Sequence, residues 1–213
     1  VEIKPKTAML NKDSSTRFGL IRHAQTVWNQ DKLIQGQKDS SLTTAGRAQS
    51  RAWSQRLAVL SFDRVLSSDL GRTVATAELI NKAFKLPMDK TSRLREQDWG
   101  GWTGRRIRDI ENEIPGELRN MEQAGWRFCP PGGESRENVW LRSRGALEDA
   151  SRRWPGETIL TVTHEGVIKC LLYGLAERKF LPQEPAMIKP YHLHWLIAGE
   201  AGLEIEQVNA IEL

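Results

Sequence analysis

Two short apolar runs, each ending beside a histidine, place the strongest limit on how this chain can fold. Residues 20–21 lead into Arg22 and His23, and residues 158–163 lead directly into His164. The second run is too continuous for the alternation of a half-exposed strand, and it is typical of a strand buried on both faces of a parallel sheet. Open α/β sheets bind ligands beyond the carboxyl ends of their strands, so both histidines are expected in one crevice.

Helices are expected between the strands. Four of them begin at or just after Thr43, Asp69, Ser135 and His164. The apolar positions with helical spacing in these segments are Ala48, Ala52, Trp53, Leu57 and Leu60, then Val74, Ala77, Ile80 and Phe84, then Val139, Ala146, Leu147 and Ala150, then Ile168, Leu171, Leu172 and Leu175. Late strands are expected at residues 192–197 and 203–208. This alternation predicts an α/β fold with a largely parallel sheet covered on both faces.

Arg22 and His23 suit phosphoryl transfer. An imidazole attacks phosphorus when one nitrogen keeps its lone pair and the other is held, and a neighbouring guanidinium neutralises the phosphoryl oxygens. A lone histidine at a strand end is more often a structural hydrogen-bonding residue, so the pair alone leaves both interpretations open. His164 is expected to be a phosphate ligand or a partner of His23.

A second phosphate-binding group is expected at Arg72. The Ser67-Ser68-Asp69 turn follows a short apolar run, with Asp69 as the candidate N-cap and Arg72 in the first helical turn. There the guanidinium and the positive end of the helix dipole act on the same anion. A solvated surface arginine is the alternative.

The candidate proton donor is Glu96. It stands in a Gly-rich loop beside Trp99 and Trp102, and a carboxyl group in partly apolar surroundings can stay protonated near neutrality and protonate a leaving alkoxide. Spacing does not separate Glu96 from Asp98, and an ordinary exposed glutamate is the alternative.

Together these motifs resemble the histidine phosphatase superfamily, in its phosphoglycerate-mutase-like branch. The resemblance runs from about Arg17 to the end of the chain. The matching positions, in the family's order, are Arg22-His23-Ala24, Thr26, Asn29, Gln35-Gly36, Asp39, Leu42-Thr43, Gly46, Ser67–Ala77, Leu94, Glu96, Gly100–Gly104, Pro131–Ser135 and Thr163-His164. Ala24 replaces a glycine, which is tolerable if the turn keeps φ negative.

The resemblance implies a three-layer α/β/α sandwich with a mostly parallel, mixed central sheet. It implies a phosphohistidine on His23, with Glu96 as proton donor. The remaining implied site residues are Arg22, Arg72 and His164 as catalytic groups and Asn29, Thr26, Gln35, Gly36 and Glu165 as substrate-binding groups. Glu165 replaces a common glycine, and its carboxylate either repels phosphate or serves as a second acid. No metal or other cofactor is expected.

These observations rank three candidate functions. A phosphomonoesterase comes first, because little chain lies between Thr103 and Pro130 for the extra segments that enclose the substrate of the family's mutases. A phosphoglycerate mutase comes second, and a non-catalytic phosphate-binding protein third. The branch includes α-ribazole phosphatases and broad-specificity phosphatases. A second anionic group of the substrate could bind at Lys38, Arg95, Arg105, Arg106 or Lys169, whereas His192 and His194 are interpreted as structural.

Length and composition agree with one domain at residues 17–213 after a polar tail at residues 1–16. The net charge of +4 is spread along the chain, so a small phosphorylated substrate is expected rather than nucleic acid. The chain lacks an apolar stretch of about 18 residues, so no membrane association is expected. Cys129 and Cys170 are expected to be reduced, in a cytoplasmic protein. The sequence leaves open whether the protein forms a homodimer.

Overall fold

The computed structural model describes residues 15–213. Strand β1 (Thr16–Arg22) begins one residue before the predicted start of the domain. Thr16 is buried, and its hydroxyl donates to the carbonyl of Trp154, so this residue is part of the fold. The rest of the predicted tail, residues 1–14, lies outside the described residues.

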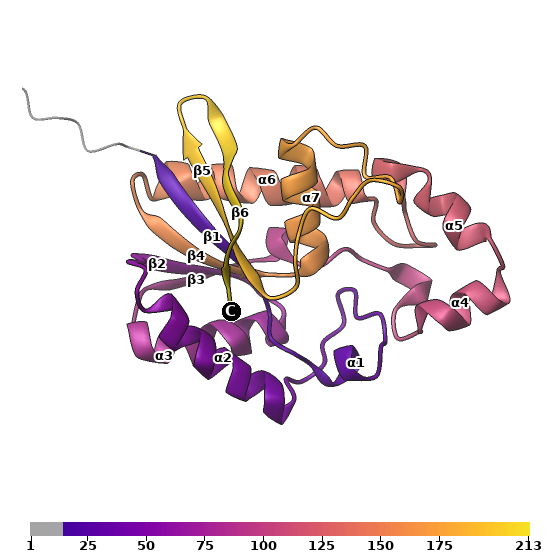
Figure 1. Ribbon diagram of the computed structural model, residues 1–213, viewed down its shortest axis with the longest axis horizontal. Coiled ribbons are helices and arrows are strands. Elements are labelled where there is room, and N and C mark those ends of the chain that lie inside the picture. The colour runs from indigo at the N-terminus through magenta and orange to yellow at the C-terminus, as the bar shows by residue number, and fades with distance from the viewer. Residues whose placement is uncertain (1–14) are drawn as a thin grey trace, which may run out of the picture.

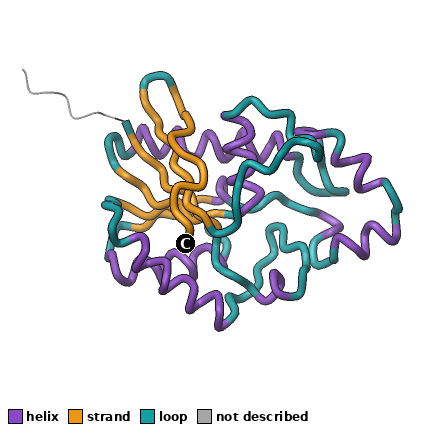
Figure 2. The backbone as a smooth tube through the Cα atoms, viewed as in Figure 1, coloured by secondary structure: helices purple, strands orange, loops and turns teal. Residues whose placement is uncertain are grey.

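A six-stranded mixed sheet forms the centre of the molecule, and Figure 2 shows its strands gathered on one side. The strands besides β1 are β2 (Arg64–Ser68), β3 (Met88–Thr91), β4 (Thr158–Thr163), β5 (His192–Gly199) and β6 (Gly202–Glu212). Their order is β3-β2-β4-β1-β5-β6; the first four run parallel, and β5 and β6 add antiparallel pairs. The mostly parallel, mixed sheet is therefore confirmed.

Helices cover both faces of this sheet, as Figure 1 shows. One face carries α2 (Thr44–Leu57) and α3 (Gly71–Phe84), and the other carries α6 (Arg136–Arg153) and α7 (Glu165–Leu175). Side chains of β1 alternate between the two cores: Leu20 packs with the α6 and α7 residues and Ile21 with the α2 and α3 residues. The predicted three-layer α/β/α sandwich is confirmed.

Three short helices lie on the side of the sheet toward which β1 runs (Figure 1). They are α1 (Val27–Gln30), α4 (Ile107–Glu113) and α5 (Glu117–Glu122). A third apolar cluster, Trp102, Ile110, Leu118 and Phe128, packs α4 and α5 against the Gly-rich loop. Trp102 is thus a core residue. These segments wall the crevice at the carboxyl ends of the parallel strands.

Two predicted N-caps are confirmed and one is wrong. Thr43 caps α2 and Ser135 caps α6 through their hydroxyls. Asp69 does not cap α3, because both of its carboxylate oxygens bind Arg95, at 2.6 and 2.7 Å. Leu70 occupies the N-cap position without a side-chain bond.

The buried face of α2 also differs from the prediction, since Ala48 and Ala52 are exposed. Gly46 and Ser50 take the inner positions beside the apolar residues. A Cβ on Gly46 would lie 2.1 Å from the carbonyl oxygen of Gln25, so backbone packs directly on this helix. No described helix is long and apolar enough to cross a membrane. The cytoplasmic location stays a prediction.

His194 gives the fold a defined acid sensitivity. It is 2% exposed on β5, its Nδ1 accepts from the backbone amide of Asn209, and burial, with a smaller effect of His192, lowers its pKa to about 4. The unfolded chain binds a proton near pH 6.5, so the stability from neutral His194 is complete above pH 6.5 and is lost as the pH falls toward 4. Between pH 7 and 5 this loss is about 2 kcal/mol.

We therefore expect the His194→Gln variant to lose less stability between pH 7 and 5 than the unsubstituted protein, by about 2 kcal/mol. Urea unfolding at both pH values measures the difference, and the matched His192→Gln variant should keep most of the pH dependence, because burial is the larger cause of the His194 shift. An unchanged pH dependence in His194→Gln would show that His194 does not carry the effect.

Candidate active site

A cavity of about 470 Å³ opens where β1 and β4 end, within the size range of small-molecule sites. We call it the main cavity. Its walls are formed by Arg22, His23, Asn29, Leu33, Ile34, Gln35, Gly36, Arg72, Glu96, Gln97, Trp99, Ile107, Arg136, Glu165, Gly166, Lys169, Cys170 and Phe180. Most of the predicted site residues therefore meet around one space.

His23 is held with one ring nitrogen available to the cavity. Its Nδ1 lies 2.8 Å from the carbonyl oxygen of Ala24, which can only accept, so Nδ1 carries the hydrogen. Its Nε2 is then unprotonated and accepts from Nε of Arg72 at 3.3 Å. Burial, with the charges of Arg22 and Arg72, holds the pKa of His23 well below its ordinary value. The imidazole is therefore neutral and presents Nε2 as a nucleophile.

Ala24 fits the turn that follows. Its φ is negative, its side chain is buried, and its amide donates to the hydroxyl of Thr76 at 3.1 Å. The condition under which alanine can replace glycine here is met. The turn that follows the nucleophile therefore accommodates Ala24 in place of glycine.

The guanidinium of Arg72 is held in a fixed position next to Nε2 of His23. Its side chain is 1% exposed, and it donates to the carbonyls of Gly36 and Lys38 at 2.7 and 2.8 Å. It also pairs with Asp39 at 3.2 Å. Arg72 lies in the first turn of α3, as predicted. A buried arginine with this many fixed donors keeps its position before any anion arrives.

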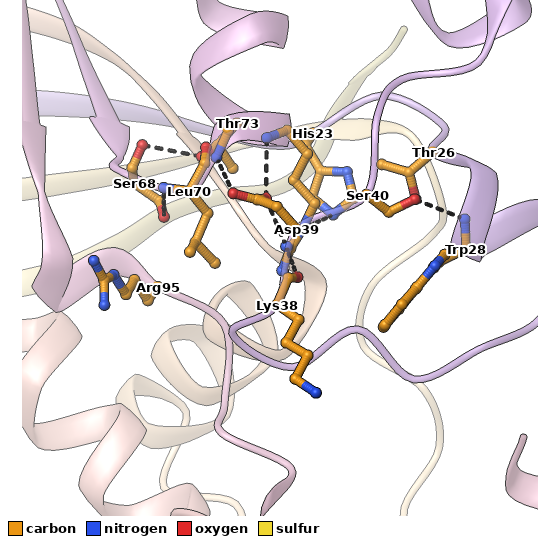
Figure 3. Close-up of polar contacts among 12 residues, drawn as sticks. His23, Thr26, Trp28, Lys38, Asp39, Ser40, Ser68, Leu70, Thr73 and Arg95 are labelled. Carbon is orange, nitrogen blue, oxygen red and sulfur yellow. Dashed lines mark hydrogen bonds and ion pairs between the residues drawn. The ribbon is translucent and has the colours of Figure 1, made fainter. Parts of the chain in front are cut away.

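Asp39 replaces the predicted cap of α3. Its carboxylate accepts from the amide of Gly71 at 2.6 Å and from the amide of Arg72 at 3.3 Å. Figure 3 shows Asp39 reaching the start of this helix close to His23, while the side chain of Lys38 extends away. Asp39 is thus a positioning residue that fixes both ends of Arg72, its backbone and its guanidinium.

We expect Asp39→Asn to raise the KM for a phosphomonoester by about tenfold, because the charge-assisted bonds to Arg72 are lost while the shape is kept. Steady-state kinetics with phosphate-release detection measures this. Asp63→Asn, at the far end of the sheet, is the control and should leave KM unchanged. An unaltered KM in Asp39→Asn would contradict the positioning role.

His164 packs against His23, with ring centroids 5.3 Å apart, so the two histidines do share one crevice. It is fully buried and is not among the wall residues of the main cavity. Its Nε2 lies 3.0 Å from the hydroxyl of Ser68, whereas its Nδ1 has no partner among the described residues. Burial, and then the charges of Arg72 and His23, hold its pKa well below the ordinary value. Nδ1 is therefore a buried polar atom whose hydrogen-bonding capacity no described residue uses.

Glu96 lies on the wall of the main cavity, where its side chain contacts the first turn of α7. Its carboxylate accepts from the amides of Gln97 and Gly166, at 2.9 and 3.3 Å. A Cβ at position 166 would lie 2.3 Å from a Glu96 oxygen, so a larger residue there would displace this carboxylate. Asp98, the predicted alternative donor, is not among the wall residues, and its carboxylate accepts from the amide of Gly100.

Glu165, the other alternative donor, is an ion-pair partner in the wall. It binds Arg22 at 2.6 Å and Lys169 at 2.8 Å. Burial acts to raise the pKa of Glu165, but the charges of Arg22 and Lys169 outweigh it and lower this pKa. The ionised carboxylate therefore forms ion pairs with two cations of the main cavity and offsets one of their two charges.

Besides Glu165, three predicted substrate-binding residues line the main cavity: Asn29, Gln35 and Gly36. The buried side-chain oxygen of Gln35 has no partner among the described residues. Thr26 lies elsewhere: it is fully buried and caps α1 by accepting from the amide of Asn29, whose side chain bonds back to it. Thr26 thus positions Asn29 rather than facing the cavity.

Of the five cations predicted to meet a second anionic group, only Lys169 lines the main cavity. Arg95 is paired with Asp69, and Arg105 with Glu113. The residue that sequence reasoning missed is Arg136, which directly follows the Pro-Gly-Gly-Glu-Ser turn. That position after a recognised motif was the available signal.

The remaining missed wall residues are mainly apolar. They include Leu33, Ile34, Ile107 and Phe180. Trp99, predicted to lie near Glu96, lines the main cavity with it. Cys129 and Cys170 are free, and burial raises the pKa of the Cys170 thiol, so this thiol is a neutral part of the wall. Among residues 15–213, no group of three or more His, Cys, Asp or Glu side chains is placed to hold a metal ion.

The main cavity thus brings together a buried neutral histidine that accepts from Arg72, a second arginine, Arg22, and the carboxylate of Glu96. Groups of these kinds are chemically suited to phosphoryl transfer. The chain belongs to the histidine phosphatase superfamily, branch 1, whose family model matches residues 18–211. It is 37% identical, over 153 residues, to the probable phosphoglycerate mutase GpmB of Salmonella choleraesuis, covering 72% of this chain and 71% of that protein.

Solved structures agree with this assignment. Bacillus stearothermophilus YhfR superposes with a TM-score of 0.83 at 27% identity, covering 92% of this chain and 98% of the other. A mycobacterial glucosyl-3-phosphoglycerate phosphatase in complex with VO3 has a TM-score of 0.79 at 28% identity, covering 92% and 99%. The chain therefore has phosphatases and a mutase-like protein among its relatives.

Proposed function

We propose that this protein is a metal-independent phosphomonoesterase that forms a phosphohistidine on His23. The observation that carries the proposal is the hydrogen bond from Nδ1 of His23 to Ala24, which leaves Nε2 unprotonated beside Arg72. The name of the mycobacterial phosphatase supports hydrolysis as the reaction.

In the first half-reaction, Nε2 of His23 forms a bond to phosphorus as the bond from phosphorus to the ester oxygen breaks. Glu96 gives its proton to that oxygen, so a neutral alcohol leaves. Arg22, Arg72, His164 and Asn29 stabilise the charge on the phosphoryl oxygens. The bond from Nδ1 to Ala24 remains and stabilises the positive charge of the phosphorylated ring.

In the second half-reaction, the Glu96 carboxylate removes a proton from water as the water oxygen attacks phosphorus. The bond from phosphorus to Nε2 breaks, inorganic phosphate forms, and His23 returns to its neutral state. Glu96 is again protonated, so protons and electrons balance over the cycle. Both half-reactions use the same set of phosphate ligands.

A phosphoglycerate mutase is the second candidate, favoured by the 37% identity to the probable mutase GpmB. It shares the first half-reaction and differs in the acceptor, because the phosphoryl group returns to a sugar acid instead of water. The two candidates therefore give different products from one phosphoenzyme.

The experiment is a panel of phosphomonoesters with excess chelator, including 3-phosphoglycerate and 2,3-bisphosphoglycerate, assayed for both free phosphate and isomerisation. We expect phosphate release that persists in chelator. Isomerisation without release would replace the phosphatase by the mutase, and loss of release in chelator would contradict metal independence. No reaction with any ester would leave the binding-protein interpretation.

A further inference from the structure

Arg136, at the start of α6, is a cation in the wall of the main cavity that forms no ion pair with a carboxylate among the described residues. Its guanidinium packs 4.3 Å from the ring centroid of Phe128 and 4.3 Å from that of Phe180. Its Nη1 donates to the carbonyls of Gly125 and Phe180, at 3.2 and 3.4 Å. Within residues 15–213 no ion pair and no partner for Nε or Nη2 is formed.

Each of the other cations of the main cavity forms an ion pair with a carboxylate. Glu165 pairs with Arg22 and Lys169, and Asp39 pairs with Arg72. Burial lowers the pKa of Arg136, and the charge of Glu122 acts in the opposite direction without forming an ion pair. A guanidinium keeps its charge in proteins, so a half-buried cation is left without a carboxylate in direct contact. Leaving such a charge unpaired costs free energy unless a ligand supplies the counter-charge.

We propose that Arg136 binds a second anionic group on the leaving group of the substrate, a carboxylate or a phosphate. The inference rests on the proposed function and names its substrate class: phosphomonoesters of anionic alcohols. The two aromatic rings fix the plane of the guanidinium, and its free Nε and Nη2 edge matches the geometry of a carboxylate or phosphate. Such a fixed cation recognises an anion with little loss of side-chain entropy.

The position of Arg136 agrees with a leaving-group role. It lines the main cavity, which contains His23, and also a smaller cavity of about 270 Å³ that shares Arg22, Lys169 and Phe180 with it. Arg136 therefore lies where the two cavities meet, together with Arg22, Glu165, Lys169 and Phe180. A leaving group that extends from the reacting phosphate into the smaller cavity passes this residue.

The test compares matched pairs of esters that differ in the second anion. The pair 3-phosphoglycerate and glycerol 3-phosphate examines a carboxylate, and the pair fructose 1,6-bisphosphate and fructose 6-phosphate examines a phosphate. We expect the enzyme to favour the ester that carries the second anionic group, in at least one pair, by about tenfold or more in kcat/KM. The pair that shows the preference identifies the anion.

The Arg136→Met variant should lose most of this preference through a higher KM for the favoured ester, and Arg136→Lys should lose part of it. Arg144→Met is the matched control: Arg144 lies on the same helix over Trp140 but lines neither cavity, and its variant should keep the full preference. An equal preference in Arg136→Met and the unsubstituted enzyme, or no preference for either anion, would overturn the proposal.

Equilibrium binding separates this inference from the proposed function. Calorimetric titration of His23→Ala with the same ester pairs needs no turnover, and the preference should be present there and absent from His23→Ala/Arg136→Met. If no ester is hydrolysed but this binding difference persists, the phosphatase proposal fails and the role of Arg136 stands. If hydrolysis occurs without a binding difference, the proposed role of Arg136 fails and the phosphatase proposal stands.

Discussion

Replacing His23 with alanine is expected to lower phosphate release by at least about four orders of magnitude, because the nucleophile of both half-reactions is lost. Its Nε2 is the unprotonated ring nitrogen beside Arg72, while Nδ1 is committed to Ala24. Phosphate release measured under saturating ester, in chelator, tests this. Thermal unfolding of the variant shows whether the fold is kept.

The control for His23→Ala is His23→Asn. The asparagine amide can still donate to the carbonyl of Ala24 but offers no nucleophilic nitrogen, so the turn is preserved and activity should be equally low. If His23→Asn retained substantial turnover in a folded protein, His23 would have a positioning role and another group would attack phosphorus.

The second large effect is expected for Glu96→Gln. The amide keeps the shape of the side chain but cannot donate a proton in the same way, so kcat for alkyl phosphates should fall by about 10²- to 10⁴-fold. For p-nitrophenyl phosphate, whose phenolate leaves without protonation, the first half-reaction should be much less affected. The difference in burst rate between the two kinds of ester is the measurement.

Two control variants distinguish Glu96 from the other carboxylates. Asp98→Asn alters a side chain that is not on the cavity wall, and Glu165→Gln alters one that pairs with Arg22 and Lys169. Neither should show a loss that depends on the leaving group. If Glu165→Gln showed this dependence and Glu96→Gln did not, Glu165 would be the proton donor.

The sequence predicts those parts of the site that depend on local patterns. His23 and His164 each follow a buried strand, and strands β1 and β4 pair in parallel register, so their ends meet. The same local reasoning places Arg72 in the first turn of α3 and Glu96 in the Gly-rich loop. Each of these residues owes its place to the element next to it in the chain.

Other features depend on residues far apart in sequence and could not be predicted in this way. Asp69 has the right spacing to cap α3, but Arg95 takes its carboxylate, and Asp39 reaches the helix from another loop. Thr26 has the right spacing for a ligand, but its hydroxyl is used to cap α1. Competition between such partners is decided by tertiary packing.

Arg136 illustrates the same limit for charge. Arginine is frequent in this chain, and sequence alone does not show which guanidinium lacks a carboxylate partner. The missing counter-charge is visible only when Phe128, Phe180 and the cavity wall are in place. The residue that sets the proposed substrate class is therefore a structural finding.

The most direct test of the central claim is to trap the enzyme during turnover. An ester with a radiolabelled phosphoryl group is mixed rapidly with the protein, the reaction is stopped in alkali, and the labelled peptide is identified by mass spectrometry. The account predicts a phosphoryl group on a nitrogen of His23 that disappears at the rate of phosphate release. Turnover without any labelled protein, or a label on another residue, would contradict it.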